Sequence, residues 1–275
     1  MAKPFLKWVG GKTQLLPDLM ILKPPSYGKY FEPFLGGGAL YFALEPKNAV
    51  INDFNPHLSE LYKDVRDSIE ELIRELTVVQ EHYLSSTDHE TRRGFYLEYR
   101  DIYNNLDSSI YKSALFLFLN KTCFNGVYRE NPKGQFNVPF GRNNIKSLFD
   151  EGLLRSASDI LQGTKITNGS YDKVLEMAET GDFVYLDPPY VPLTKTASFT
   201  KYTSDGFGPE EQVKLRDLFV KLRDRGCYVM LSNSSADEVR ELYKGFSHHE
   251  VLANRAVNCK ATGRGKITEL IITSY

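Results

Sequence analysis

Four short apolar segments separated by helical stretches constrain the fold of this chain more than any other feature. They lie at residues 29–34, 48–53, 182–187 and 227–233, with a weaker fifth at 164–168. Runs that are apolar throughout are typical of parallel strands buried on both faces. Helical patterns lie between and after them, at residues 170–179, 209–225 and 236–243. Strands that alternate with helices in this way predict a parallel, doubly wound α/β sheet.

The C-terminal region departs from this alternation. Residues 248–255 and 266–275 each have the pattern of a strand, and the loop between them is rich in glycine, lysine and arginine. Two consecutive strands joined by such a loop predict a terminal β-hairpin.

The middle of the chain also interrupts the sheet pattern. From about residue 56 to residue 119 the apolar side chains recur at helical spacing, and an aromatic, loop-like stretch follows. We therefore expect a catalytic domain made of residues 1–55 and 161–275, with a helical domain inserted at residues 56–160.

Composition limits the functional classes. The net charge is −1, so any contact with nucleic acid must come from a local basic patch. The three cysteines, Cys123, Cys227 and Cys259, are odd in number and far apart, which favours a reducing cytoplasm over a disulfide framework. No apolar run approaches the 18 residues that a membrane span needs, and no histidine spacing indicates a metal site. These observations predict a cytoplasmic protein without a membrane partner or a metal.

A glycine turn, Gly36 to Gly38, follows the first apolar segment. By itself it could be an ordinary tight turn between strand and helix. A dinucleotide fingerprint would need a third glycine where Tyr41 stands, so a cofactor without a pyrophosphate, such as S-adenosyl-L-methionine (AdoMet), fits better. Asp53 ends the next apolar segment, where a carboxylate can accept two hydrogen bonds from a ribose diol. The alternative role for Asp53 is to cap the helix that follows.

The segment Gly11-Lys12-Thr13 has the ending of a phosphate-binding loop. The leading glycine of that motif would fall on Leu6, so the phosphate cradle is incomplete. A P-loop NTPase is therefore a weaker alternative.

The tetrapeptide Asp187-Pro188-Pro189-Tyr190 follows the third long apolar segment. It could be a turn that ends a strand. The carboxyl end of a parallel strand is, however, where open α/β sheets bind ligands, and the tetrapeptide combines a carboxylate, a stiff backbone and an aromatic ring. A catalytic role is the preferred interpretation.

Four motifs recur here in the order and spacing of one known family: KWVGGK at 7–12, YFEPFLGGGALYF at 30–42, NDFN at 52–55 and DPPY at 187–190. The chain resembles the Dam/DpnII-type adenine-N6 DNA methyltransferases (D12 class, alpha group), and is most similar to the methylase of the DpnII system. The resemblance implies a Rossmann-like sheet that binds AdoMet, an inserted helical domain that recognises duplex DNA, and no metal. It assigns Trp8, Lys12, Asp53 and Asp187 to contacts with AdoMet, above a turn formed by Gly36 and Gly38.

The resemblance also implies the catalytic roles. The N6 amine of adenine is a poor nucleophile because its lone pair is drawn into the ring. Asp187 and the backbone carbonyl of Pro188 would accept its two hydrogens and aim the lone pair at the methyl group. Tyr190 would stack on the adenine, which must first flip out of the helix.

Residues 121–146 carry five basic side chains and one acidic one. Composition alone fits a solvated loop as well as a phosphate-binding patch. FNGVYR and QFNVPFGR, however, resemble the GATC-reading hairpin of the family. The resemblance assigns base contacts to Lys7, Asn125, Val127, Arg129 and Pro139, and phosphate contacts to Lys121, Asn131 and Arg142. Asn143 stands where the family commonly has tyrosine, so we expect a shorter reach and relaxed selectivity at the outermost base contact.

The expected activity is thus methylation of adenine N6, with base flipping, within GATC in double-stranded DNA. The segment around DPPY is closer to the DpnII side of the family, which favours the modification half of a restriction–modification system. A cognate restriction endonuclease would then act on the same site without forming a stable complex. The alternatives are an orphan Dam-like methylase and a DNA-binding relative without catalytic activity.

Overall fold

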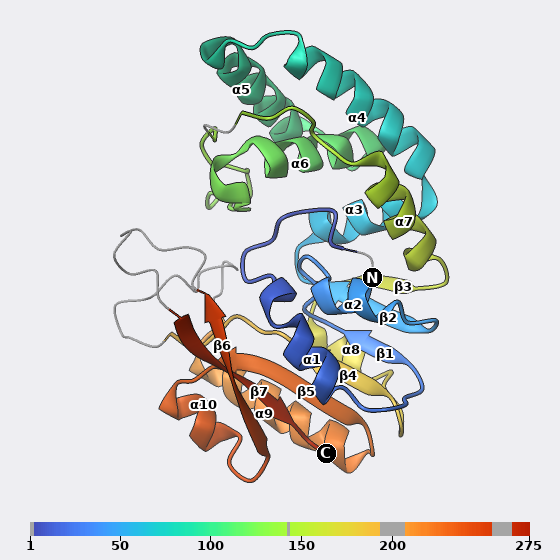
Figure 1. The fold of residues 1–275 in the computed structure, drawn as a ribbon, viewed down its shortest axis with the longest axis vertical. Helices are drawn as coiled ribbons and strands as arrows, with labels where there is room; N and C mark the ends of the chain where they lie inside the picture. The colour runs from blue at the N-terminus through green and yellow to red at the C-terminus, as the bar shows by residue number, and fades with distance from the viewer. Residues whose placement is uncertain (1–2, 142–143, 193–206, 255–265) are drawn as a thin grey trace. The chain divides into compact units, whose positions relative to one another are not determined.

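The computed structural model describes residues 3–141, 144–192, 207–254 and 266–275 (Figure 1). The strands are β1 (Tyr30–Glu32), β2 (Ala49–Asp53), β3 (Lys165–Asn168), β4 (Phe183–Leu186), β5 (Tyr228–Ser234), β6 (Ser247–Asn254) and β7 (Lys266–Thr273). The helices are α1 (Leu16–Leu22), α2 (Ala39–Leu44), α3 (Pro56–Asp67), α4 (Ile69–Leu84), α5 (His89–Asn105), α6 (Ile110–Thr122), α7 (Glu151–Leu161), α8 (Tyr171–Leu175), α9 (Pro209–Asp224) and α10 (Asp237–Leu242). Two short 3₁₀ helices cover Lys12–Gln14 (η1) and Phe124–Gly126 (η2).

The strands form one seven-stranded sheet in the order β3-β2-β1-β4-β5-β7-β6. β1 pairs in parallel with β2 and β4, and β4 pairs in parallel with β5. β7 runs antiparallel to both β5 and β6. The expected parallel α/β sheet with a C-terminal antiparallel hairpin is confirmed. The chain reaches β2 and β4 on opposite sides of β1, which makes the carboxyl ends of β1 and β4 a topological switch point.

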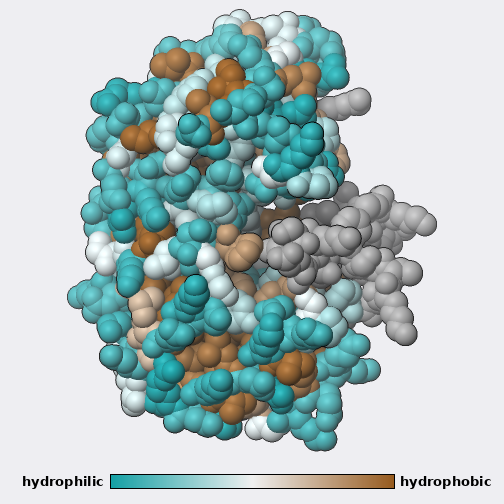
Figure 2. All heavy atoms as spheres, turned by 180° about the vertical axis from the view of Figure 1, so that it is seen from behind, coloured by the Kyte–Doolittle hydropathy of each residue, from teal (hydrophilic) through white to brown (hydrophobic). Residues whose placement is uncertain are grey.

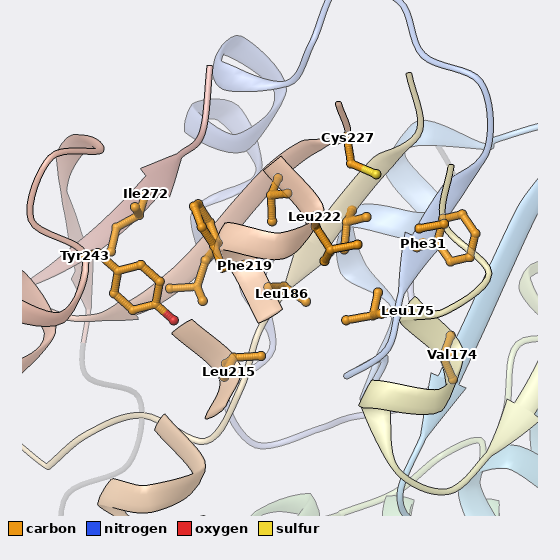
Figure 3. Close-up of a cluster of buried hydrophobic side chains, with 14 of the residues drawn as sticks. Phe31, Val174, Leu175, Leu186, Leu215, Phe219, Leu222, Cys227, Tyr243 and Ile272 are labelled. Atoms are coloured by element: carbon orange, nitrogen blue, oxygen red, sulfur yellow. The ribbon is translucent and has the colours of Figure 1, made fainter. Parts of the chain in front are cut away.

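The segments of the sequence that are apolar throughout form strands whose side chains are buried in the core of the sheet. Phe31 of β1 pairs with Val184 of β4, which pairs in turn with Val229 of β5, and all three side chains are buried. Leu215 and Phe219 of α9, which are four residues apart on one helix face, belong to the same buried cluster (Figure 3). Burying a side chain such as Phe219 stabilises the fold by about 1.5–3 kcal/mol.

The chain divides into two compact units, and each is described here by itself. The first contains residues 1–11, 36–45 and 53–169, and the second contains residues 12–35, 46–52 and 170–275. The first therefore holds α2 to α7, and the second holds α1, α8 to α10 and most strands. The division into a catalytic and an inserted domain is a statement about function and stays a prediction.

Helix α6 is the buried centre of the first unit. Its residues 113–120 are all buried, and α3, α4 and α5 pack around it. Polar side chains begin the neighbouring helices: Asn55, Asp88 and Asp150 accept hydrogen bonds from the first turns of α3, α5 and α7. None of the helices among the described residues is long and apolar enough to cross a membrane. Hydrophilic side chains cover much of the face drawn in Figure 2.

Helices α1 and α7 were not expected from the sequence. Both carry a recognisable start signal: Pro17 lies in the first turn of α1, and Asp150 caps α7 by accepting a hydrogen bond from the Leu153 N–H at 3.0 Å.

Candidate active site

Asp187 directly follows β4, at the switch point of the sheet. Its Oδ1 lies 2.8 Å from Nζ of Lys12, and both side chains are largely buried, at 17% and 9% exposure. Burial raises the pKa of Asp187 to about 6, although the Lys12 ammonium works in the opposite direction; the charge of Glu269 raises it further. The site therefore holds a carboxylate that costs free energy to keep charged, a feature common at functional sites.

The Tyr190 side chain contacts a carboxylate through its hydroxyl and an ammonium group through its ring. Its hydroxyl donates to Oε2 of Glu269 on β7 at 2.8 Å, and Nζ of Lys12 lies 4.6 Å from the ring centroid. Desolvation is the main cause that raises the pKa of Tyr190, so the hydroxyl stays protonated and acts as a donor. Lys12, Asp187, Tyr190 and Glu269 thus form one cluster of the second unit.

Two amide side chains hold the backbone of the tetrapeptide. Gln212 of α9 donates from Nε2 to the Pro189 carbonyl at 2.9 Å, and Asn233 of β5 accepts from the Val191 N–H at 3.2 Å. Gln212 and Asn233 also bond to each other at 3.2 Å, and both are buried. Pro188, whose carbonyl is the predicted second acceptor, is buried within this supported segment.

The glycine turn belongs to the first unit and is held from two sides. The Gly36 N–H donates to Oδ2 of Asp53 at 2.9 Å, and the Gly36 carbonyl accepts from the Tyr62 hydroxyl at 3.0 Å. Gly36 has φ +49, and a Cβ there would lie 2.6 Å from Cδ1 of Trp8. Gly38 also has a positive φ, +65, as the residue that precedes α2. The turn and the close approach therefore require glycine at position 36.

Asp53 is not the cap of the next helix. Asn55 fills that role, because its Oδ1 accepts from the N–H groups of His57 and Leu58 at 3.0 and 3.3 Å. Burial raises the pKa of Asp53, while hydrogen bonds from backbone N–H groups, that of Gly36 among them, lower it. The structure thus joins the Asp53 carboxylate to the glycine turn.

Trp8 stacks with two aromatic rings of the same unit. Its ring centroid lies 5.7 Å from Tyr128 and 6.4 Å from Phe116, with interplanar angles of 25° and 14°. Trp8 is half-buried, so part of its surface is open to a ligand. Tyr128 was not singled out in the sequence, because nothing in its neighbourhood indicates a partner 120 positions earlier.

Gly36→Ala is expected to lower the free energy of unfolding by about 1–3 kcal/mol, because the new Cβ combines backbone strain with a clash against Trp8. AdoMet affinity should fall as well, because Trp8 or the turn must move. Thermal unfolding and calorimetric titration with AdoMet measure the two effects. Gly163→Ala is the matched control: its φ is +76 but a Cβ there meets nothing within 4 Å, so it should lose stability and keep its affinity. Equal AdoMet affinities in the two variants would contradict the assignment of the turn.

Residues 123–141, which follow α6, fold into a loop closed by several backbone hydrogen bonds. Near its base, the Phe124 N–H donates to the Pro139 carbonyl at 2.9 Å. Nearer its tip, the Asn137 N–H donates to the Arg129 carbonyl at 3.1 Å. Asn125 and Gly126 both have positive φ, 58 and 65, so the tight Asn-Gly turn predicted from the sequence is confirmed.

The predicted DNA contacts gather on this loop and beside it. Lys7, Lys121, Asn125, Arg129 and Pro139 are exposed, whereas Val127 and Asn131 are half-buried. The Asn131 side chain accepts from the N–H groups of Lys133 and Gln135, so it closes the tip of the loop. Arg142 and Asn143 lie outside the described residues.

The exposed Arg129 side chain makes two hydrogen bonds to Asn137. Its Nε donates to Oδ1 of Asn137 at 2.7 Å, and a guanidinium nitrogen lies 3.3 Å from the Asn137 carbonyl. One edge of the guanidinium is thereby held by the loop itself. Asn137 was missed in the sequence, since an asparagine in an aromatic loop carries no signal of its partner.

Comparison with known proteins identifies the family of the chain. Residues 8–257 match the model of the D12 class N6 adenine-specific DNA methyltransferase. The chain belongs to this family. It is an N6 adenine-specific DNA methyltransferase, and the resemblance found in its motifs is confirmed. No group of three or more metal-binding side chains occurs in the described part of this methyltransferase.

Three relatives match the methyltransferase over nearly their whole length. The Type II methyltransferase M1.LlaDCHI of Lactococcus lactis subsp. cremoris is 45% identical, with 99% of this chain and 95% of the relative covered. The Type II methyltransferase M.MjaIII of Methanocaldococcus jannaschii is 44% identical, with 99% of both chains covered. The DNA adenine methylase of Vibrio cholerae is 33% identical over 98% of this chain and 95% of the relative.

Proposed function

We propose that this methyltransferase methylates adenine N6 within GATC in duplex DNA, with AdoMet as the methyl donor and with the adenine flipped out of the helix. The observation that carries the proposal is the largely buried Asp187 at the end of β4, held beside Tyr190 in a supported DPPY segment. A flipped base needs acceptors for its exocyclic amine and an aromatic face, and this segment offers both.

Asp187 and Pro188 would prepare the amine. With the N6 hydrogens bonded to the Asp187 carboxylate and the Pro188 carbonyl, the nitrogen lone pair is directed away from the ring plane. Gln212 and Asn233 hold the backbone that carries these acceptors, so little reorganisation is needed when the adenine arrives. Tyr190 would stack on the base while Glu269 fixes its hydroxyl.

The residues assigned to AdoMet fit its chemistry. AdoMet supplies an electrophilic methyl group on a sulfonium. Asp53 offers a carboxylate for the ribose diol, Trp8 an aromatic face, and Lys12 a cation for the carboxylate of the amino-acid moiety. Gly36 lets the backbone come close to a ligand, since no side chain fits there.

A pH profile tests the role of Asp187. The charged carboxylate is a stronger acceptor for the amine than the neutral acid is, and the pKa of Asp187 is raised to about 6. In the free enzyme, kcat/KM should be constant well above pH 6 and fall by about tenfold per unit below it. Lys12→Met removes the ammonium that lowers the pKa, so the midpoint of the fall should move to higher pH. A profile that stays flat down to pH 5 would contradict the role.

Thermal shifts with AdoMet and with ATP separate a methyltransferase site from a phosphate-binding one. Stabilisation by AdoMet and none by ATP is expected, because Lys12 is paired with Asp187 rather than set in a complete phosphate loop. The site preference follows from sequencing N6-methyladenine in plasmid DNA treated with the enzyme. A motif other than GATC would overturn the specificity and leave the methyltransferase activity intact.

We also infer that the enzyme is the modification half of a restriction–modification system. The two relatives at 45% and 44% identity are named Type II methyltransferases, whereas the DNA adenine methylase of Escherichia coli strain K12 is 32% identical. DNA from cells that express the enzyme should resist an endonuclease that cuts only unmethylated GATC. A gene for such an endonuclease beside this one supports the role, and its absence favours an orphan methylase.

A further inference from the structure

We propose that Asn120, near the end of α6, is a positioning residue that sets sequence selectivity by fixing Lys7 against the Asn125-Gly126 turn. The proposal rests on the proposed function in one respect, namely that Lys7 and the 123–141 loop read bases. Asn120 itself is buried, at 6% exposure, and cannot touch DNA. Its effect must pass through the residues that it holds.

The Asn120 side chain is a two-sided clamp on the backbone of Lys7. Its Oδ1 accepts from the Lys7 N–H at 2.9 Å, and its Nδ2 donates to the Lys7 carbonyl at 2.8 Å. The same Nδ2 lies 3.3 Å from the carbonyl of Gly126. A single amide therefore joins the N-terminal segment to the turn of the loop, across 113 residues of sequence.

The Lys7 side chain leaves this clamp along the turn. A Cβ on Gly126 would lie 2.9 Å from Cδ and 3.0 Å from Cβ of Lys7, so the lysine stem packs directly on the glycine. Gly126 also has φ +65, which favours glycine independently of the contact. Lysine is a flexible point charge and discriminates bases poorly when its stem is loose. In this protein Asn120 holds the backbone of Lys7, and the Lys7 side chain packs on Gly126 as far as Cδ.

A second asparagine performs the equivalent task on the other side of the loop. Asn104 of α5 donates from Nδ2 to the Phe136 carbonyl at 3.0 Å and accepts from the Phe136 N–H at 2.8 Å. The next residue, Asn137, holds the Arg129 guanidinium. Asn104 thus supports Arg129, whereas Asn120 supports Lys7. The two clamps provide matched variants that should alter different parts of the recognised site.

The test measures methylation rates on duplexes that carry every single-base change of the wild-type site. Asn120→Asp keeps the acceptor for the Lys7 N–H but turns a carboxylate oxygen towards two carbonyls. Asn104→Asp keeps the acceptor for the Phe136 N–H and turns a carboxylate oxygen towards the Phe136 carbonyl. We expect Asn120→Asp to relax selectivity by about tenfold, within the range for losing one base contact, at the same position as Lys7→Ala. Asn104→Asp should follow the profile of Arg129→Ala instead.

Gly126→Ala tests the same idea without touching Asn120. Its Cβ would displace the Lys7 stem, so its profile should also match that of Lys7→Ala. If Asn120→Asp fails to fold, the profile of Gly126→Ala alone is compared with that of Lys7→Ala. The proposal would be overturned if the methylation rates of Asn120→Asp and Gly126→Ala fell equally at all sites. It would also be overturned if these variants lost selectivity at the base position that Arg129→Ala affects. A wild-type enzyme without any site preference would instead overturn the proposed function.

Discussion

Asp187→Ala is expected to reduce the single-turnover rate of adenine methylation by about 10²–10³-fold or more, the usual cost of removing one preorganised electrostatic partner from a transition state. The variant loses the acceptor for one N6 hydrogen, so the amine stays conjugated with its ring. It also removes the carboxylate that lies 2.8 Å from Nζ of Lys12, so AdoMet affinity should fall too. Rapid-quench methylation of a short duplex at saturating AdoMet measures the chemical step apart from cofactor binding.

Tyr190 variants provide the control for this result. Tyr190→Ala removes the aromatic face and should weaken productive capture of the base while AdoMet affinity stays near that of the wild type. Tyr190→Phe keeps the ring and loses only the bond to Glu269, so its defect should be smaller than that of Tyr190→Ala. A near-normal single-turnover rate in Asp187→Ala would show that the acceptor lies elsewhere.

Arg129→Ala should produce the largest loss of sequence discrimination, about 1–3 kcal/mol, which is the value of a bidentate arginine–guanine contact. Arginine is suited to this contact, and Asn137 already holds one edge of the Arg129 guanidinium. The side chain therefore loses less conformational entropy when it binds a base. Near-cognate sites that differ at one base should then be methylated almost as fast as GATC. Competition between cognate and near-cognate duplexes in one tube gives the ratio directly.

Lys121→Ala is the matched control for Arg129→Ala. Lys121 is also exposed and basic, but its predicted partner is a phosphate, which carries no sequence information. Its loss should weaken all sites alike and reduce the salt dependence of binding. An Arg129 variant that behaves like the Lys121 variant would remove this arginine from base reading.

The sheet could be predicted because its evidence is local. The parallel strands β1 and β4 are buried along their whole length, and the start of α9 is marked by Pro209 followed by two glutamates in its first turn. The glycine turn and the Asp-Pro-Pro-Tyr run could also be picked out from the sequence, and their roles in binding and catalysis stay predictions. Spacing alone could not decide between two roles for Asp53, and the structure excludes capping because Asn55 performs it.

The residues that support the site could not be predicted, because their hydrogen-bond partners lie far away in the sequence. Gln212 appears as one polar residue in an amphipathic helix, and Asn233 as a polar residue ending a strand. Asn120 ends an apolar run in the same inconspicuous way. All three side chains are buried. Most of their hydrogen bonds go to backbone or amide groups at least 20 positions away in the sequence. A single sequence shows the polar residue but not the bond that it satisfies.

The clamp between Asn120 and Lys7 also has a consequence for how the chain acquires its structure. Residues near the start of the chain cannot dock until α6 and the Asn-Gly turn have left the ribosome, because their partners lie 113 residues downstream. Local helices can form earlier, so docking of this segment belongs to a late folding step. Trp8 is the only tryptophan of the protein, and it stacks on Tyr128 within the same arrangement. Stopped-flow tryptophan fluorescence therefore reports the docking step, and a signal that develops as fast as helix formation measured by circular dichroism would contradict this order.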